Sequence, residues 1–374
     1  SRIMTAIQSK CLTLLLVAFC SISMIGAANA QENPMLFLSR ANAVVAKAAG
    51  LTKSWEVPAE GPKLQKKKKI VFIAADLSDP GIVGVFNGIK EAVKGADWEL
   101  LYIDCRGRCN QGAAIVSQAL DMAPNGIILA GVDATSQAKG LAAAAKAKVP
   151  VVGWHSMVKS GPSEGLFTNI TSNPKEAAQI AALYGVVESN SKAGIVVFSD
   201  MSSPYTAAKS NAIVEVIKQC ENCRLLSVED VPVAEAYTKM SKVVENLEKK
   251  FGTKWTHAIG VNDVYFDLME KPTISALMGT NKVIGLSAGD GSYSAFKRIR
   301  GNLLQIGTVP EPLFMHGWQL VDEMNRAFSG VAPSGYVTPV HLVTNQNIAY
   351  DGGPKNMFDP DNDYRNQYLK IWAK

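Results

Sequence analysis

The strongest constraint on the fold is a regular alternation of short apolar runs with amphipathic stretches. Eight apolar runs of strand length occupy residues 70–75, 99–103, 126–130, 149–154, 194–199, 224–228, 257–261 and 282–286. Between the first two, Ile82, Phe86, Ile89 and Val93 fall on one helical face. Strands that are apolar throughout are buried on both faces, as in parallel sheets covered by helices. The alternation therefore predicts an α/β chain built from βαβ units.

The eight runs divide into two sets of four. The division falls at residues 169–174, where polar residues precede a long Ala-rich helical stretch. We therefore predict two similar doubly wound parallel-sheet lobes joined by a hinge. The first lobe is expected at residues 69–169 plus 309–335, and the second at residues 170–308 plus 336–374. In open parallel sheets ligands bind off the carboxyl ends of the strands, so polar residues there are candidates for a site.

The first 68 residues are expected to lie outside the lobes. Residues 11–26 are apolar, follow a lysine and are followed by Ala-Asn-Ala, which is typical of a secretory signal cleaved after Ala30. We expect Met4 to be the natural start and the three residues before it to be a cloning remnant. A retained anchor is the alternative, although a membrane span needs about 20 apolar residues. Residues 31–68 are predicted to form a helical leader and a linker.

The charge gives no sign of a nucleic-acid partner. The formal net charge is +5, and removal of the first 30 residues takes away two basic residues and no acidic one, which leaves +3. The lysines and arginines are scattered, and the longest basic run, residues 66–69, is short. A nucleic-acid-binding protein would show a basic stripe or patch instead.

Four cysteines remain after removal of the signal, in two close pairs. Cys105 and Cys109, and Cys220 and Cys223, are predicted to form local disulfides in an oxidising compartment. Redox chemistry is the alternative for the Cys-x-x-Cys pair. That pair follows a helical stretch, however, and a helix C-terminus disfavours a thiolate. Zinc would need two further ligands, and no second Cys or His pair has the spacing.

Polar and aromatic side chains follow most of the predicted strands. In chain order these candidates for ligand binding are Asp79, Trp154, His155, Tyr205, Lys209, Asn262, Asp263, Asp290, Thr308 and Glu311. Carboxylates and amides form hydrogen bonds with hydroxyl groups, and aromatic faces pack on the apolar face of a sugar ring. The set predicts a polyhydroxylated ligand rather than a phosphate or a metal.

The candidates also have plainer structural interpretations. Asp79 and Asp290 could be helix N-caps, since aspartate accepts hydrogen bonds from free amides there. The aromatic, histidine and lysine candidates could be core or surface side chains. Asn262 with Asp263 at a strand end is the pair that most favours ligand contact.

Motifs for catalysis and for metal binding are missing. The sequence has no Walker or His-Glu-x-x-His motif, and we expect no catalytic residues and no cofactor. Residues 359–367 place oxygen side chains at positions 1, 3, 5 and 9 of a calcium loop. Tyr364 stands where such a loop needs glycine, and position 12 has no glutamate. We expect this segment to cap a last helix over residues 364–372 instead.

Several short stretches occur in a characteristic order and spacing. They are Asp79-Pro80, Asn125-Gly126-Ile127-Ile128, Pro150-Val151-Val152, Val261-Asn262-Asp263, Val283-Ile284-Gly285, Asp290-Gly291 and Gly317-Trp318. In this respect residues 69–344 resemble the periplasmic sugar-binding proteins of ABC transporters, the ribose-binding-like group of type I solute-binding proteins. The resemblance implies an exported binding protein whose two lobes close on a small ligand.

The resemblance carries over to some site positions and fails at others. The family's first polar contact falls on Asp79, and Asn262 and Asp290 also match. The family's aromatic pair after the proline is not matched, because Gly81 and Ile82 stand there.

Two arginines of the family are also missing. Its Asp-Arg pair at the end of strand four is replaced by His155-Ser156, and Tyr205 or Lys209 is nearest to its arginine in the second lobe. Ordinary pentose or hexose recognition is therefore not assumed, and Trp154 is a candidate replacement for the stacking surface.

The sequence as a whole predicts a monomeric periplasmic solute-binding protein. It would bind a sugar or polyol between its lobes and deliver it to the membrane permease of an ABC importer. A periplasmic sensor subunit for a receptor or sensor kinase remains an alternative, because the same closed surface would serve both. A repressor would need a DNA-binding module where the signal stands, and an enzyme would need a nucleophile and base.

Overall fold

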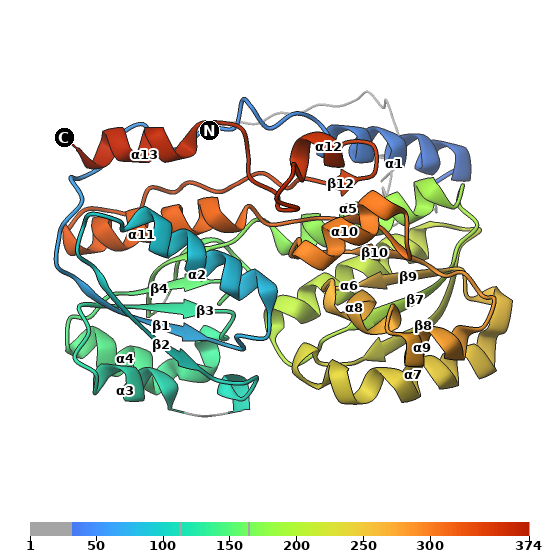
Figure 1. Ribbon diagram of the computed structural model, residues 1–374, viewed down its shortest axis with the longest axis horizontal. Helices are drawn as coiled ribbons and strands as arrows, with labels where there is room; N and C mark the ends of the chain where they lie inside the picture. The colour runs from blue at the N-terminus through green and yellow to red at the C-terminus, as the bar shows by residue number, and fades with distance from the viewer. Residues whose placement is uncertain (1–31, 112–113, 164, 374) are drawn as a thin grey trace, which may run out of the picture.

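Two lobes lie side by side in the computed structural model, which describes residues 32–111, 114–163 and 165–373. Each lobe is a sheet with helices on both faces (Figure 1). The predicted architecture of two doubly wound α/β lobes is confirmed. The predicted signal, residues 1–30, lies outside the described residues.

The first lobe contains a six-stranded sheet in the order β2-β1-β3-β4-β6-β5. Its strands are β1 (Lys69–Ala74), β2 (Glu99–Asp104), β3 (Gly126–Ala130), β4 (Val151–Trp154), β5 (Gly161–Ser163) and β6 (Leu166–Ile170). Its helices are α2 (Pro80–Ala92), α3 (Ile115–Leu120), α4 (Ala138–Lys146) and α11 (Leu313–Phe328). All pairings are parallel except that of β5 with β6.

The second lobe repeats this plan in the order β12-β11-β10-β9-β7-β8. Its strands are β7 (Gly194–Ser199), β8 (Arg224–Asp230), β9 (His257–Gly260), β10 (Ile284–Ser287), β11 (Gln305–Thr308) and β12 (Val343–Thr344). Its helices are α5 (Pro174–Glu188), α6 (Pro204–Gln219), α7 (Ala236–Phe251), α8 (Val264–Met269), α9 (Pro272–Ser275), α10 (Tyr293–Gly301) and α12 (Ile348–Asp351). All eight predicted strands are present, and the first four of each lobe are arranged identically.

The central strands explain why the apolar runs are continuous. In β1, Ile70, Phe72 and Ala74 pack into one core cluster, while Val71 and Ile73 pack into another on the opposite face of the sheet. All five side chains are fully buried. Helices α2 and α11 cover the first face and α3 and α4 cover the second (Figure 1). A strand between two helical layers must be apolar at every position.

Helices α2 and α11 touch through their backbones. A Cβ on Gly317 would lie 2.6 Å from the Cα and carbonyl carbon of Gly88, and a Cβ on Gly88 would lie 2.6 Å from the Phe314 carbonyl oxygen. Backbone atoms cannot move aside as a flexible side chain can. This close contact fixes α11 on the first lobe.

Gly317→Ala is therefore expected to destabilise the protein by about 1–3 kcal/mol, the usual cost of overpacking. Urea unfolding measures the change. Gly301→Ala is the control, because its new Cβ would meet only the Leu303 side chain at 3.7 Å. Equal stability of the two variants would contradict the backbone contact.

The leader helix α1 (Pro34–Ala48) docks on the second lobe. Phe37, Ala41 and Val45, spaced four residues apart, join the core cluster that contains α5. The chain then reaches the first lobe, where the Asn325 amide donates to the carbonyl oxygens of Pro62 and Lys63. The leader therefore contacts both lobes.

The last helix, α13 (Tyr364–Trp372), lies with the first lobe, whereas the sequence placed residues 336–374 with the second. Trp372 stacks on Trp318 of α11 with ring centroids 5.4 Å apart, and its indole donates to Asp322 at 2.9 Å. The aromatic side chains of α13 pack on α11, and this contact places α13 in the first lobe.

Within the described residues, the helices lack the combination of length and apolar character that a membrane crossing needs.

Candidate ligand-binding site

A cleft of about 190 Å³ lies between the lobes, off the carboxyl ends of their strands. From the first lobe it is lined by Ala75, Asp76, Asp79, Ile82, Gly107, Cys109, Asn110, Gly131, Trp154 and His155. From the second it is lined by Asp200, Ser202, Ser203, Tyr205, Thr206, Lys209, Pro232, Val233, Ala234, Glu235, Val261, Asn262 and Asp290.

The structure brings seven of the ten predicted residues together in this cleft. They are Asp79, Trp154, His155, Tyr205, Lys209, Asn262 and Asp290. Asp263, Thr308 and Glu311 do not line it. Asn110 and Glu235 line the cleft without having been predicted. They follow β2 and β8. The rule that ligands bind off the carboxyl ends of parallel strands, here called the strand-end rule, identifies both residues when it is applied to those two strands as well.

Asp79 joins the start of α2 to the cleft. Its Oδ1 accepts a hydrogen bond from the Gly81 amide at 2.9 Å, so it is the N-cap that the sequence offered as the plainer interpretation. Burial, together with the charge of Asp290, raises the pKa of Asp79 to about 7. The same residue therefore caps a helix and presents a titratable acid to the cleft.

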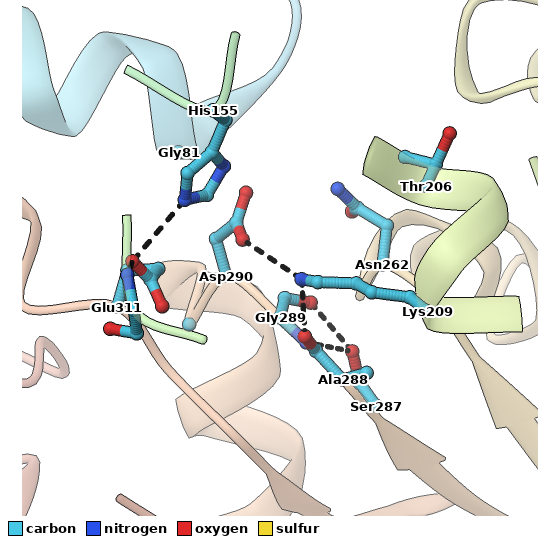
Figure 2. A network of polar contacts seen from close by, with 12 residues as sticks. Gly81, His155, Thr206, Lys209, Asn262, Ser287, Ala288, Gly289, Asp290 and Glu311 are labelled. Carbon is cyan, nitrogen blue, oxygen red and sulfur yellow. Dashed lines mark hydrogen bonds and ion pairs between the residues drawn. The ribbon is translucent and has the colours of Figure 1, made fainter. Parts of the chain in front are cut away.

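Asp290 enters the cleft from the second lobe beside Lys209 (Figure 2). The Lys209 ammonium donates to the Ala288 carbonyl at 2.6 Å and lies 3.8 Å from Asp290 Oδ1. Burial raises the pKa of Asp290, and the charges of Lys209 and His155 oppose that shift. A Cβ on Gly81 would lie 2.7 Å from Asp290 Oδ2, so the two lobes meet at this point.

Three rings stack across the lobe boundary. His155 lies on Trp154 with centroids 3.6 Å apart and against Tyr205 of the second lobe at 4.3 Å. His155 has a φ of +53°, in a left-handed region that non-glycine residues seldom adopt. Because His155 covers one face of Trp154, that face does not meet a ligand in this arrangement.

Glu311 lies behind the cleft, where the chain crosses between the lobes. Its Oε2 lies 3.2 Å from His155 Nε2 and accepts from the Ser172 amide at 3.3 Å. The His316 Nε2 lies 2.8 Å from the Thr338 hydroxyl, which in turn lies 3.0 Å from the Ser172 hydroxyl. The three crossing segments, residues 171–173, 309–312 and 329–342, therefore share one buried polar network.

The protonation of this network follows from its geometry. The Trp154 indole donates to His316 Nδ1 at 3.0 Å, so that nitrogen carries no proton and Nε2 donates to Thr338. Burial lowers the pKa of His316 to about 4, although Glu311 opposes the shift. Burial alone would raise the pKa of Glu311, but the hydrogen bond with His155 and nearby positive charge hold it well below its usual range.

His316 should make the protein less stable in mild acid. The unfolded chain takes up this proton near pH 6.5 and the folded chain only near pH 4, so stability falls as the pH drops through that window. Between pH 7 and pH 5 the wild type is expected to lose about 2 kcal/mol more than His316→Gln. Urea unfolding at both pH values measures the difference. Parallel losses would contradict the neutral, buried imidazole.

Asn262 and Asp263 are neighbours at the end of β9 but face different surroundings. The Asn262 side-chain oxygen accepts from the Val264 amide at 3.0 Å, and the residue lines the cleft. The buried Asp263 carboxylate accepts from the Gly291 and Ser292 amides at 2.8 and 3.1 Å. It also accepts from the side chains of Gln305 and Thr308, at 2.8 and 2.9 Å.

Asp263 therefore positions the loop that carries Asp290, and Thr308 supports Asp263. The sequence predicted ligand contact for both residues, but their polar atoms are turned into the second lobe.

Both predicted cysteine pairs are at disulfide distance, with Cα atoms 5.3 Å apart in each. Cys220 follows the end of α6, as the sequence indicated. The Cys105–Cys109 loop lies at the cleft, and a Cβ on Gly107 would overlap that of Ala234 in the other lobe. This loop is a second place where the lobes meet.

The calcium-like segment is engaged in protein contacts. Asp359 accepts hydrogen bonds from Tyr364 and Arg365 at 2.6 and 2.8 Å. Asp363 precedes α13 but makes no side-chain capping bond, and instead accepts from the Asn366 side chain. The helix is where the sequence predicted it, but the predicted capping is not made by Asp363. Among the described residues, no three His, Cys, Asp or Glu side chains are grouped to hold a metal.

The two-lobed fold with an interlobe cleft defines a class of binding proteins. The family described as periplasmic binding protein domain matches residues 70–330, and the chain belongs to this family. Family and fold are those of binding proteins and not of enzymes, and the family implies a location outside the cytoplasm.

Solved structures with the same fold include sugar-binding proteins. A galactofuranose binding protein is 15% identical with a TM-score of 0.65, over 82% of this chain and 100% of its own. A solute-binding protein of an ABC transporter from Agrobacterium vitis, with bound allitol, is 20% identical with a TM-score of 0.63, over 75% and 96%. The XylFII-LytSN complex contains a chain that is 15% identical with a TM-score of 0.62, over 75% and 98%. A comparison with curated protein sequences gave no match.

Proposed function

We propose that this protein is a periplasmic solute-binding protein that holds a sugar or polyol in the interlobe cleft. The observation that carries the proposal is the convergence of Asp79 from one lobe with Asn262 and Asp290 from the other at one cleft. Carboxylate and amide groups suit hydroxyl groups, and closure would complete the set from both sides. The allitol and galactofuranose of the structural neighbours belong to this chemical class.

Delivery to the permease of an ABC importer is the second part of the proposal. The closed lobes would present one continuous surface to the membrane partner, and a monomer with a removed signal peptide would suffice. A sensor role is the other candidate. It is supported by the fold that this protein shares with a chain of the XylFII-LytSN complex. Co-purification of the liganded protein with a permease supports import, whereas co-purification with a sensor kinase supports sensing.

A thermal-shift screen of pentoses, hexoses and polyols tests ligand binding. A true ligand at 100 times its Kd should stabilise the native protein by about 2.7 kcal/mol. Incubation of each hit with the protein, followed by analysis of the ligand for chemical change, tests for turnover. Absence of stabilisation by the whole panel, or turnover of a hit, would overturn the proposal.

A further inference from the structure

The side chains that line the cleft carry more negative than positive charge. The carboxylates among the described lining residues are Asp76, Asp79, Asp200, Glu235 and Asp290, whereas the one lysine or arginine among them is Lys209. Glu235 is half-exposed and pairs with Lys239 at 3.1 Å. Partly buried carboxylates are costly unless positive charge or hydrogen bonds compensate them.

Two of the carboxylates accept hydrogen bonds from neighbouring loop residues. Asp76 accepts from the amide and the hydroxyl of Ser78 at 2.9 and 2.7 Å. Asp200 accepts from the Ser202 amide with one oxygen and from the Val233 amide with the other, at 2.9 and 3.0 Å. These bonds shape the loops after β1 and β7, and they engage both oxygens of Asp200 but only Oδ1 of Asp76.

Asp79 and Asp290 converge on one point from opposite lobes. Asp79 Oδ2 and both Asp290 oxygens make no hydrogen bond to a described residue, and Asp290 is only 8% exposed. A Cβ on Gly81 would lie 2.7 Å from Asp290 Oδ2 and 3.2 Å from Asp79 Oδ1. Lys209 lies 3.8 Å from Asp290 and gives its short bond to the Ala288 carbonyl. The Lys209 ammonium therefore compensates the charge of Asp290 only in part.

The aromatic rings of the cleft are engaged with protein groups. His155 lies between Trp154 and Tyr205, and the Lys209 ammonium lies 5.1 Å from the centroid of Tyr205. Trp154 and Tyr205 are 1% and 7% exposed. Recognition in this cleft therefore relies on charge and hydrogen bonds more than on stacking.

We propose that the ligand carries an amine as well as hydroxyl groups, and that its ammonium is held between Asp79 and Asp290. The inference rests on the proposed function and narrows its ligand to amino sugars or amino polyols. An ammonium donates three hydrogen bonds and supplies the positive charge that the two acids lack. The raised pKa of Asp79, about 7, agrees with an acid short of such a partner.

Calorimetric titration of the full chain with matched compounds tests the inference. The probes are D-glucose, D-galactose, D-mannose and sorbitol, their amino counterparts D-glucosamine, D-galactosamine, D-mannosamine and glucamine, and the N-acetylated sugars, which keep the nitrogen without its charge. At least one amine is expected to bind about tenfold or more tightly than both its hydroxyl and its N-acetyl counterpart.

Two isosteric variants test which carboxylate gives the preference for the amine. Asp79→Asn keeps a side-chain oxygen for the Gly81 amide and should abolish the preference for the amine, because affinity for the amine falls more than affinity for the hydroxyl compound. Asp76→Asn makes the same charge change in the same loop and should keep the preference, because Ser78 holds Oδ1 of Asp76 and the ammonium is assigned to Asp79 and Asp290.

The outcomes separate this inference from the proposed function. Neutral sugars that bind as tightly as the amines would overturn the inference and leave the sugar site standing. Equal loss of amine preference in both variants would overturn the assignment to Asp79. Absence of binding by all probes would overturn the inference, and the pentose and polyol screen would then decide the proposed function separately.

Discussion

Asp263→Ala is expected to destabilise the second lobe by about 3–5 kcal/mol, the cost of breaking a buried charged network. The Asp263 carboxylate is 1% exposed and accepts four hydrogen bonds, two from backbone amides and two from side chains. Alanine would leave the Gly291, Ser292 and Thr308 donors buried without this partner, whereas the Gln305 amide keeps the Gly307 carbonyl at 3.3 Å. Each unpaired buried group costs about 1–3 kcal/mol. The free energy of unfolding in urea measures the loss.

Glu245→Ala is the control for removal of a negative charge. Glu245 pairs with Lys249 at 3.0 Å on the exposed face of α7, where an ion pair contributes little. Its loss should change the stability far less than the loss of Asp263 does. If Asp263→Ala costs no more than Glu245→Ala, Asp263 does not have the scaffold role assigned to it.

Asn262→Ala is expected to weaken ligand binding by about 1–3 kcal/mol, or roughly 5- to 150-fold. The Asn262 side chain uses its oxygen for the Val264 amide, which leaves its NH₂ group as a donor for the cleft. Removal of that donor would leave a buried ligand hydroxyl unpaired. Calorimetric titration with a ligand from the screen measures the change.

Asn262→Ser separates binding from local structure. Serine can still accept from the Val264 amide, because its hydroxyl commonly bonds to backbone groups two residues ahead. This variant should therefore fold like the wild type and bind as weakly as Asn262→Ala. Wild-type affinity in both variants would remove Asn262 from the site.

The sheets could be predicted because their strands are buried on both faces. Runs such as Ile70 to Ala74 are apolar at every position only when helices cover both sides, and this signal is local in the sequence. Strands β5 and β6 were missed because the β5 segment is Gly-Pro-Ser and β6 contains the buried polar residue Asn169. The position of α13 depends on Trp318, which lies 54 residues before Trp372 in the sequence and gives no local signal.

Only the residues of the site that follow strand ends could be predicted, because the strand-end rule was the one available signal. The rule identified Asp79, Asn262 and Asp290, because each follows directly or closely on a strand. It did not distinguish Asn262 from Asp263, since two adjacent side chains at a strand end can point in opposite directions. The role of Glu311 in joining the crossing segments also required the fold, because its partners come from distant parts of the chain.

Hydrogen–deuterium exchange with and without saturating ligand tests the central claim that the ligand binds between the lobes. We expect protection to rise together in residues 76–82 of the first lobe and in residues 200–209 and 261–291 of the second. Protection of one lobe alone, or of a surface remote from these segments, would contradict an interlobe site.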